Sequence, residues 1–201
     1  MTSKISHAIK SRKTPKDVFI TPLPLAKKQI DMIDIRDGDV WYDPFKNSGS
    51  YFNQFPETGA IHEWSEILDD KDFFEFDGKI DIISSNPPYS FLDRIITKSI
   101  ELNPRVISYL IGQQNFTSRR IEIMNNAGYS LTRCLMLKVF EWYGMGYIIQ
   151  FEKIGEISNV VEFDRTVWRS LSNNTEKKKT NRKCGICRKE GHTRRNCPDK
   201  K

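Results

Sequence analysis

The stretch IISSNPPYS at residues 82–90 decides how this chain folds. It closes an Ile-rich run, KIDIISS at residues 79–85, which is bounded by Gly78 and by prolines, as is typical of a buried strand. The two prolines remove two backbone donors and fix two φ angles, so residues 86–89 cannot extend a strand or enter a helix interior. The stretch therefore predicts a buried strand that ends in a rigid tetrapeptide, whose role lies outside regular secondary structure.

Strand and helix patterns alternate on both sides of this stretch. The first expected helix has Thr21 as its N-cap and Pro22 at its first position. The alternation predicts an α/β fold, in which a mostly parallel sheet with helices on both faces ends in a β-hairpin. The expected strands cover residues 39–43, 60–67, 79–85, 105–112, 130–140 and 146–154, and the expected helices cover residues 22–34, 91–102 and 118–129.

Composition divides the 201 residues into a compact body and polar ends. Hydrophobic residues make up 38% of the chain, which suffices for one domain, expected at residues 19–156. Residues 1–18 are expected to form a basic flexible arm, and residues 157–182 a further helix followed by a basic linker. No apolar run approaches the roughly 20 residues that a membrane helix needs, so the sequence predicts an intracellular protein, cytoplasmic or nuclear, without a membrane partner.

Positive charge is concentrated at the C-terminal end. Residues 171–201 hold eleven Lys and Arg against three acidic residues, a net charge of +8, whereas residues 1–170 sum to −2. This asymmetry is consistent with a polyanionic partner that the ends of the chain contact. A solvated tail that only keeps the protein soluble explains the charge equally well, so the charge alone leaves both interpretations open.

The same end carries a metal-binding spacing, C-x2-C-x4-H-x4-C, within residues 183–198. Three thiolates and an imidazole suit tetrahedral zinc, and Gly185 and Gly191 permit the tight turns that so small a loop requires. The spacing resembles the CCHC zinc knuckles of retroviral nucleocapsids and RNA-processing factors, which implies binding of single-stranded nucleic acid, commonly RNA. A purely structural or protein-binding zinc site is the alternative. The predicted zinc ligands are Cys184, Cys187, His192 and Cys197.

Polar residues follow the predicted strands, at the sheet edge where open α/β sheets bind ligands. The Asp43 carboxylate can pair with a cation, and the small residues 48–50 let a ligand approach the backbone. About 20 residues further on, Glu66 or Glu63 stands where an acidic side chain commonly binds ribose hydroxyls. In the following DKDFF segment, residues 72–73 offer an acceptor for an exocyclic amine beside a ring that can stack on adenine. Together these residues favour a nucleoside-containing cofactor.

DPFKNSGS at residues 43–50, followed by NPPY at residues 86–89, resembles the S-adenosylmethionine-dependent methyltransferases that modify the exocyclic N6 amine of adenine. The resemblance spans roughly residues 17–153 and implies a Rossmann-like methyltransferase fold. One departure is Asn47, which occupies a position that the family usually fills with glycine. The resemblance implies that the cofactor is bound by Thr21, Asp43, Phe45, Ser48, Gly49, Glu66, Asp72 and Phe73, and that the catalytic residues are Asn86, Pro87, Pro88 and Tyr89.

The NPPY tetrapeptide suits an amine whose lone pair is delocalised into a ring. The Asn86 side-chain oxygen and the Pro87 carbonyl can accept both amine hydrogens and aim the lone pair at a methyl donor, while Tyr89 stacks on the splayed base. The sequence thus predicts an adenine-N6 methyltransferase acting on nucleic acid, with RNA favoured over DNA because of the knuckle. The alternatives are a phage-type DNA adenine methyltransferase, a protein glutamine methyltransferase, and a catalytically inactive zinc-knuckle protein that binds nucleic acid.

Overall fold

The chain comprises two units, Met1–Arg165 and Thr166–Lys201. The computed structural model describes residues 19–57, 61–139, 145–162, 164, 184–189 and 196–199. The expected arm at residues 1–18, most of the expected linker and the expected zinc ligand His192 lie outside the described residues.

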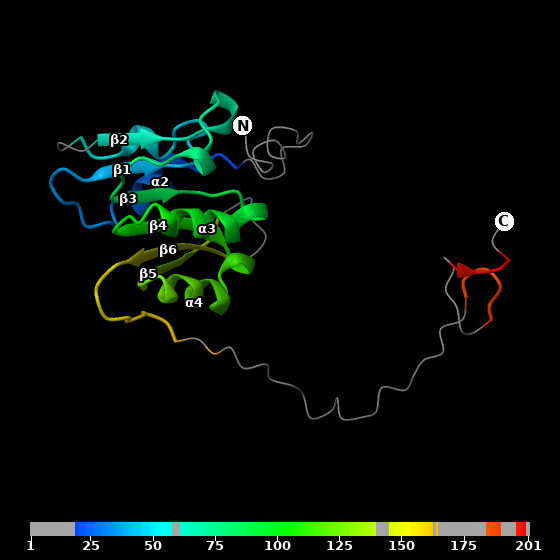
Figure 1. Ribbon diagram of the computed structural model, residues 1–201. Coiled ribbons are helices and arrows are strands. Elements are labelled where there is room, and N and C mark those ends of the chain that lie inside the picture. Colours follow the sequence, from blue (N-terminus) through cyan, green and yellow to red (C-terminus); the bar gives the residue numbers. More distant parts are fainter. Residues whose placement is uncertain are drawn as a thin grey trace. The chain divides into compact units, whose positions relative to one another are not determined.

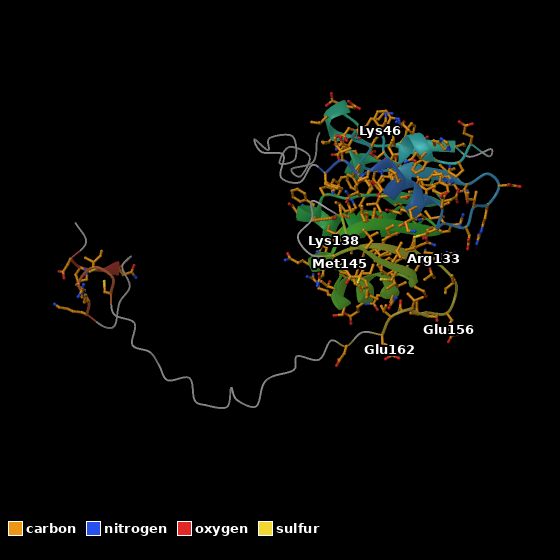
Figure 2. The ribbon with its side chains drawn as sticks, turned by 180° about the vertical axis from the view of Figure 1, so that it is seen from behind. Lys46, Arg133, Lys138, Met145, Glu156 and Glu162 are labelled. Atoms are coloured by element: carbon orange, nitrogen blue, oxygen red, sulfur yellow. The ribbon has the colours of Figure 1, made fainter. Side chains whose placement is uncertain are left out.

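A six-stranded sheet forms the first unit, with the strand order β2-β1-β3-β4-β6-β5. Strands β2, β1, β3 and β4 are parallel, whereas β6 is antiparallel to both of its neighbours. The predicted mostly parallel sheet with a terminal hairpin is therefore confirmed. Lys138 and Met145 lie side by side at the end of this hairpin (Figure 2). The strands are β1 (Val40–Asp43), β2 (Ile61–Trp64), β3 (Ile82–Ser85), β4 (Val106–Gly112), β5 (Ser130–Leu137) and β6 (Gly146–Glu152).

Helices cover both faces of the sheet (Figure 1). Helix α2 (Leu23–Ile30) packs on one face, and α3 (Leu92–Glu101) and α4 (Ser118–Asn126) pack on the other. Because successive strand residues point to opposite faces, Trp41 joins the α2 cluster and Tyr42 the other. No helix among the described residues is both long and apolar enough to cross a membrane.

The first helix is shorter than predicted. Helix α2 ends at Ile30, and Pro22 rather than Thr21 is its N-cap, with no side-chain capping bond. Beyond Ile30 the chain continues through tight turns, in which the N–H of Ile33 donates to the carbonyl of Ile30 at 3.0 Å. Ile33 is still buried against the sheet. The predicted end of the helix at residue 34 is therefore wrong, because the chain leaves the helical conformation after Ile30.

The segment after β6 is not helical where the structure describes it. Residues 157–162 form bends beside β5, where the N–H of Val160 donates to the carbonyl of Leu131 at 2.9 Å. The side chain of Asn159 accepts a hydrogen bond from the N–H of Leu131 at 2.8 Å. The helix expected within residues 157–170 is thus wrong for this part, because the backbone groups of 157–162 bond to β5 instead. The rest of that range lies outside the described residues, apart from residue 164.

Candidate active site

The buried carboxylate of Asp43 lies where β1 ends, beside the end of β3. The hydroxyl of Ser85 donates to Asp43 Oδ1 at 2.7 Å, and the N–H of Phe45 donates to the same oxygen at 3.2 Å. Burial raises the pKa of Asp43 to about 6, although the Ser85 hydroxyl and the backbone N–H groups of Phe45 and Phe52 oppose this rise. Among the residues that the structure describes, none forms a hydrogen bond to the second oxygen, Oδ2, which is equally buried. A buried carboxylate oxygen that accepts no hydrogen bond fits a ligand that carries a positive charge.

The loop after β1 is hydrogen-bonded to an acidic side chain, Glu66. Glu66 Oε2 accepts a hydrogen bond from the N–H of Asn47 at 2.8 Å, and Oε1 accepts one from the N–H of Leu68 at 3.1 Å. Of the two predicted alternatives, the structure therefore brings Glu66 to this loop. Asn47 has a φ of 45°, a left-handed conformation that asparagine tolerates better than most residues. Asparagine can therefore take the backbone conformation that glycine would take here.

Gly49 takes a backbone conformation that strains any residue with a Cβ. Its φ is +83°, and a Cβ built on it would lie 2.6 Å from Nδ2 of Asn53. Its N–H donates to the carbonyl of Lys46 at 2.7 Å, which closes the turn. The neighbouring Ser48 is exposed, and its hydroxyl lies 3.4 Å from that of Ser50. The predicted small-residue turn is thus present at the end of β1.

Both predicted adenine contacts, Asp72 and Phe73, are buried. Asp72 begins a short 3-10 helix, Phe73–Glu75, and its Oδ1 accepts a hydrogen bond from the N–H of Phe74 at 2.9 Å. The Phe73 ring is only 3% exposed and packs edge-on against Phe45, with the two ring centroids 5.2 Å apart. The structure therefore places Phe73 in the core, and its contact with a cofactor stays a prediction.

The NPPY tetrapeptide follows β3 directly. Asn86 Nδ2 donates to Thr21 Oγ1 at 3.2 Å, and the Tyr89 hydroxyl donates to Asn86 Oδ1 at 3.4 Å. Pro87 is buried, and Pro88 has an extended conformation before Tyr89 starts a 3-10 turn. Thr21 was predicted to contact a cofactor, and the structure brings its hydroxyl to the side chain of Asn86.

Two buried polar residues near this site were not predicted. Gln29 is fully buried, and its Nε2 donates to the carbonyls of Ser85 at 3.3 Å and Ser108 at 3.0 Å. Its Oε1 accepts a hydrogen bond from the Tyr51 hydroxyl at 2.8 Å. The available sequence signal was a glutamine next to Ile30 on the apolar side of an amphipathic helix.

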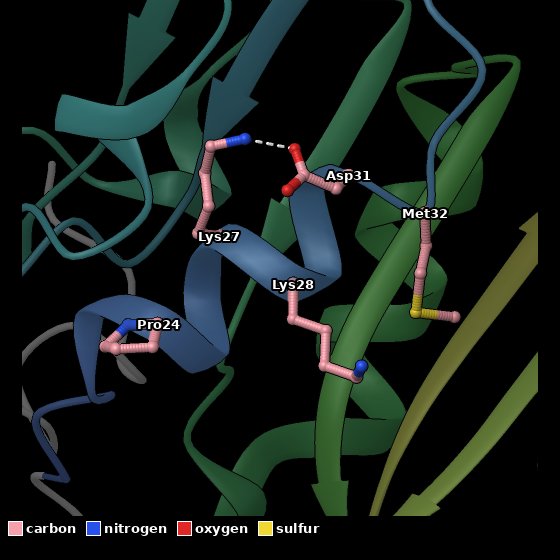
Figure 3. A pocket seen from close by; sticks show the side chains of 5 residues that line it. All are labelled: Pro24, Lys27, Lys28, Asp31 and Met32. Carbon is pink, nitrogen blue, oxygen red and sulfur yellow. Dashed lines mark hydrogen bonds and ion pairs between the residues drawn. The ribbon is translucent and has the colours of Figure 1, made fainter.

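A hollow of about 570 Å³ lies on the outer surface of α2, away from the strand ends (Figure 3). One side of it is formed by an ion pair between Lys27 and Asp31. None of the predicted site residues lines it. Its lining residues are Pro24, Lys27, Lys28, Asp31 and Met32.

Three cysteines meet in the second unit. The Sγ atoms of Cys184, Cys187 and Cys197 all lie within 4.8 Å of one another. Two thiolates on one tetrahedral zinc lie about 3.8 Å apart, given a Zn–S distance of about 2.3 Å, so this cluster fits the predicted ligand set. The left-handed residue of the turn is Arg188, with a φ of 58°. The Arg188 N–H donates to the carbonyl of Cys184 at 2.8 Å, which closes the turn.

Solved structures resemble this chain in fold. A proposed RNA methyltransferase from Pyrococcus horikoshii has a TM-score of 0.56 at 20% identity, over 75% of this chain and 98% of that chain. The E. cuniculi Mtq2–Trm112 complex, responsible for methylation of the eRF1 termination factor, has a TM-score of 0.55 at 14% identity, over 68% of this chain and 99% of that chain. Magnesium protoporphyrin IX methyltransferase from Synechocystis, with S-adenosylmethionine bound, has a TM-score of 0.51 at 14% identity, over 73% of this chain and 91% of that chain. No protein-family model and no curated protein matches the sequence. The chain has the Rossmann-like fold of S-adenosylmethionine-dependent methyltransferases.

Proposed function

We propose that this chain transfers a methyl group from S-adenosylmethionine to the exocyclic N6 amine of adenine in nucleic acid, with RNA favoured over DNA. One observation carries this proposal: the Ser85 hydroxyl donates to Asp43 Oδ1 at 2.7 Å, and Asn86 is the next residue. The carboxylate that suits the cofactor and the amide that suits the acceptor are therefore held on adjacent parallel strands. A methyl donor and an adenine amine bound there would be neighbours, as direct transfer requires.

The end of β1 would hold the cofactor, which supplies an electrophilic methyl group on a sulfonium. Asp43 Oδ2 is buried and accepts no hydrogen bond among the described residues, so the amino group of the cofactor's methionine moiety would satisfy it. Each oxygen of Glu66 already accepts one backbone hydrogen bond and retains capacity for a ribose hydroxyl. The positive φ of Gly49 and its close approach to Asn53 keep the loop backbone in the conformation that admits this ligand.

The NPPY segment would orient the acceptor. Asn86 Oδ1 and the Pro87 carbonyl would accept the two hydrogens of the adenine amine, which directs the nitrogen lone pair toward the methyl group. No strong general base is needed during attack, because the proton is lost after the C–N bond has formed. Tyr89 is half-buried and would stack on the target base.

The zinc knuckle would raise the concentration of nucleic acid near the active site. Cys184, Cys187 and Cys197 would hold zinc together with His192, and the exposed Arg188 and Lys189 on the same turn would contact phosphates. Because a tether supplies local concentration rather than base readout, we expect loose sequence specificity.

The proposal is tested by offering RNA, single-stranded DNA, duplex DNA and protein to the zinc-loaded chain with methyl-labelled cofactor. We expect label in adenine of RNA, its loss in Asn86→Ala, and a raised KM with little change in kcat in Cys187→Ser. Label in glutamine of a protein would favour a glutamine methyltransferase, which would use the same NPPY segment to hold an amide. No label in any acceptor, with nucleic-acid binding retained, would favour an inactive zinc-knuckle protein.

A further inference from the structure

A short turn after β4 lies beside the NPPY segment. Strands β3 and β4 are parallel neighbours, so the residues that follow them leave the sheet at the same edge. A Cβ built on Gly112, the last residue of β4, would lie 3.6 Å from Cε2 of Tyr89 and 3.8 Å from Nδ2 of Asn115. The Tyr89 ring and the Asn115 side-chain NH2 therefore flank the same point, which Gly112 leaves unfilled because it has no side chain.

Arg120 determines which way the Asn115 amide points. Arg120 Nη1 donates to the backbone carbonyl of Asn115 at 2.7 Å and to Asn115 Oδ1 at 3.2 Å. Arginine carries donors and no acceptor, so the amide group that faces it is the oxygen, and the NH2 lies on the Gly112 side. Within the part of the chain that the structure describes, the Asn115 side chain forms its hydrogen bond through this oxygen, which leaves the NH2 available to a ligand.

The turn is anchored at both of its ends. Arg120 lies on α4, and its Nε donates to Oδ1 of Asp93 on α3 at 2.7 Å. At the other end, the N–H of Gln113 donates to the carbonyl of Met145, just before β6, at 2.8 Å. The 3-10 turn Gln113–Asn115 is thus fixed by contacts with α4 and with the strand hairpin, and the NH2 is placed before a ligand binds.

A donor at this place suits adenine. The two ring nitrogens that flank the adenine amine, N1 and N7, are both acceptors, and a flipped base is commonly read by hydrogen bonds to its edges. With the amine at Asn86 and Pro87 and the ring on Tyr89, one of these nitrogens would face the turn after β4. A side-chain NH2 matches that acceptor, whereas guanine carries an N–H at N1 and no amine at C6.

We propose that Asn115 is a specificity-determining residue, whose side-chain NH2 donates a hydrogen bond to the ring nitrogen beside the amine of the target adenine, N1 or N7. Arg120 is the positioning residue that holds Asn115 in this orientation. The inference rests on the proposed function, because that function places an adenine on Tyr89. Neither residue takes part in the transfer of the methyl group; both act on recognition of the base.

Deaza analogues of adenine test the proposal, because each replaces one ring nitrogen by C–H and keeps the amine. We offer the zinc-loaded full chain a short single-stranded RNA with one adenine, or with its 1-deaza, 3-deaza or 7-deaza analogue. We expect kcat/KM to fall about tenfold for the 1-deaza or the 7-deaza analogue, which identifies the nitrogen, and to stay nearly constant for the 3-deaza analogue, whose changed atom is remote from the amine. Equal values for all four bases, or a fall confined to the 3-deaza analogue, would overturn the proposal.

Asn115→Ala separates a lost hydrogen bond from an altered base. We expect kcat/KM for adenine to fall about tenfold, and the variant to treat adenine and the sensitive analogue alike, because no donor remains for the nitrogen. Asn115→Asp still accepts from Arg120 but turns an oxygen toward the ring nitrogen, so its kcat/KM should be lower still. Gln114→Ala, which removes an exposed amide from the same turn, is the matched control and should keep the wild-type preference. A preference for adenine that survives in Asn115→Ala would overturn the proposal.

The positioning role is tested by Arg120→Lys, with Arg119→Lys as its matched control. Both arginines lie within ion-pair distance of Asp93, at 2.7 Å for Arg120 and 3.6 Å for Arg119, and it is Arg120 that donates to Asn115. A lysine keeps the charge but lacks the planar fork, so we expect the preference for adenine over the sensitive analogue to fall at least about threefold in Arg120→Lys and to persist in Arg119→Lys. A loss of rate that is equal for both bases would show a purely structural role for Arg120.

A binding measurement without turnover keeps this proposal distinct from the proposed function. With S-adenosylhomocysteine, which has no methyl group to transfer, we expect the wild type to bind the adenine RNA several-fold more tightly than the sensitive analogue, and Asn115→Ala to bind both equally. If the wild type transfers no methyl group but shows this preference, the proposed function fails and base recognition by Asn115 stands. If the wild type methylates adenine but binds and methylates all four RNAs equally well, the proposed function stands and base recognition by Asn115 fails.

Discussion

Replacing Asp43 by asparagine measures how much the buried charge destabilises the fold. Asp43 is 0% exposed, and burial raises its pKa to about 6, whereas a carboxyl ordinarily titrates near about 4. Between these two pH values the folded chain holds a proton that the unfolded chain has released, so the stability of the wild type falls as the pH rises. Each pKa unit corresponds to about 1.4 kcal/mol, so the loss is roughly 3 kcal/mol across this window and stays constant above it.

Asp43→Asn lacks this titration, so the stability of the variant relative to the wild type increases as the pH rises. We expect the free energy of unfolding of the variant minus that of the wild type to increase by roughly 3 kcal/mol from about pH 4 to about pH 7. Urea unfolding followed by tryptophan fluorescence measures both proteins, and their other titrating groups cancel in the difference. Burying the asparagine NH2 adds a cost that does not depend on pH, so it leaves the pH dependence of the difference in unfolding free energy unchanged. A difference that does not vary with pH would show that the pKa of Asp43 is not raised in the folded chain.

Asp43→Asn also tests whether the Asp43 carboxylate binds the cofactor. We expect Asp43→Asn to bind S-adenosylmethionine at least tenfold more weakly near neutral pH, because a buried charged partner of the cofactor's amino group is lost. Wild-type binding should weaken below about pH 6, as the carboxylate becomes protonated. Calorimetric titration at several pH values measures both effects. Equal cofactor affinity in the two proteins would contradict the assignment of Asp43 to the cofactor.

Three further predictions concern the loop after β1 and the zinc cluster. Gly49→Ala should lower stability by about 1 kcal/mol or more because of its φ of +83°, and should lower cofactor affinity because its Cβ, 2.6 Å from Asn53 Nδ2, displaces that side chain in the loop. Gly38→Ala, with a similar φ and no atom within 4 Å, should lower stability by only about 1 kcal/mol and leave cofactor affinity unchanged. Thermal unfolding and calorimetry compare the two variants. Asn47→Gly should be nearly neutral in thermal unfolding and Asn47→Val destabilising by about 1–2 kcal/mol, and equal behaviour would show that the left-handed φ of 45° is not required. Chelation of zinc, or Cys187→Ser, should weaken nucleic-acid binding while the unfolding temperature of the first unit stays constant; a parallel drop in that temperature would show that the knuckle supports the body.

Local patterns predicted the parts of the site that follow directly from strand ends. The Ile-rich run and the two prolines located β3 and NPPY, and the order of parallel strands brought Asp43 to the same edge. Glu66 was one of two predicted alternatives, and the structure brings its carboxylate to the N–H of Asn47, while its contact with a ribose stays a prediction. These features depend on neighbours that are close in sequence or on adjacent strands.

Features that depend on tertiary packing were not predicted. Threonine is common at helix N-caps, but the Thr21 hydroxyl accepts a hydrogen bond from Asn86, which is 65 residues away in sequence. Gln29 interrupts an apolar face, and only the folded sheet places two strand carbonyls beneath its NH2. Phe73 was predicted as a stacking ring, and its burial against Phe45 follows from a loop conformation that periodicity does not encode.

The identity of the methylated atom decides whether this chain is an adenine-N6 methyltransferase. RNA incubated with the zinc-loaded chain and methyl-labelled S-adenosylmethionine is digested to nucleosides and analysed by mass spectrometry, beside Asn86→Ala as control. We expect labelled N6-methyladenosine from the wild type and none from the variant. Label on a ring nitrogen, a ribose hydroxyl or a carbon, or equal label from both proteins, would contradict it.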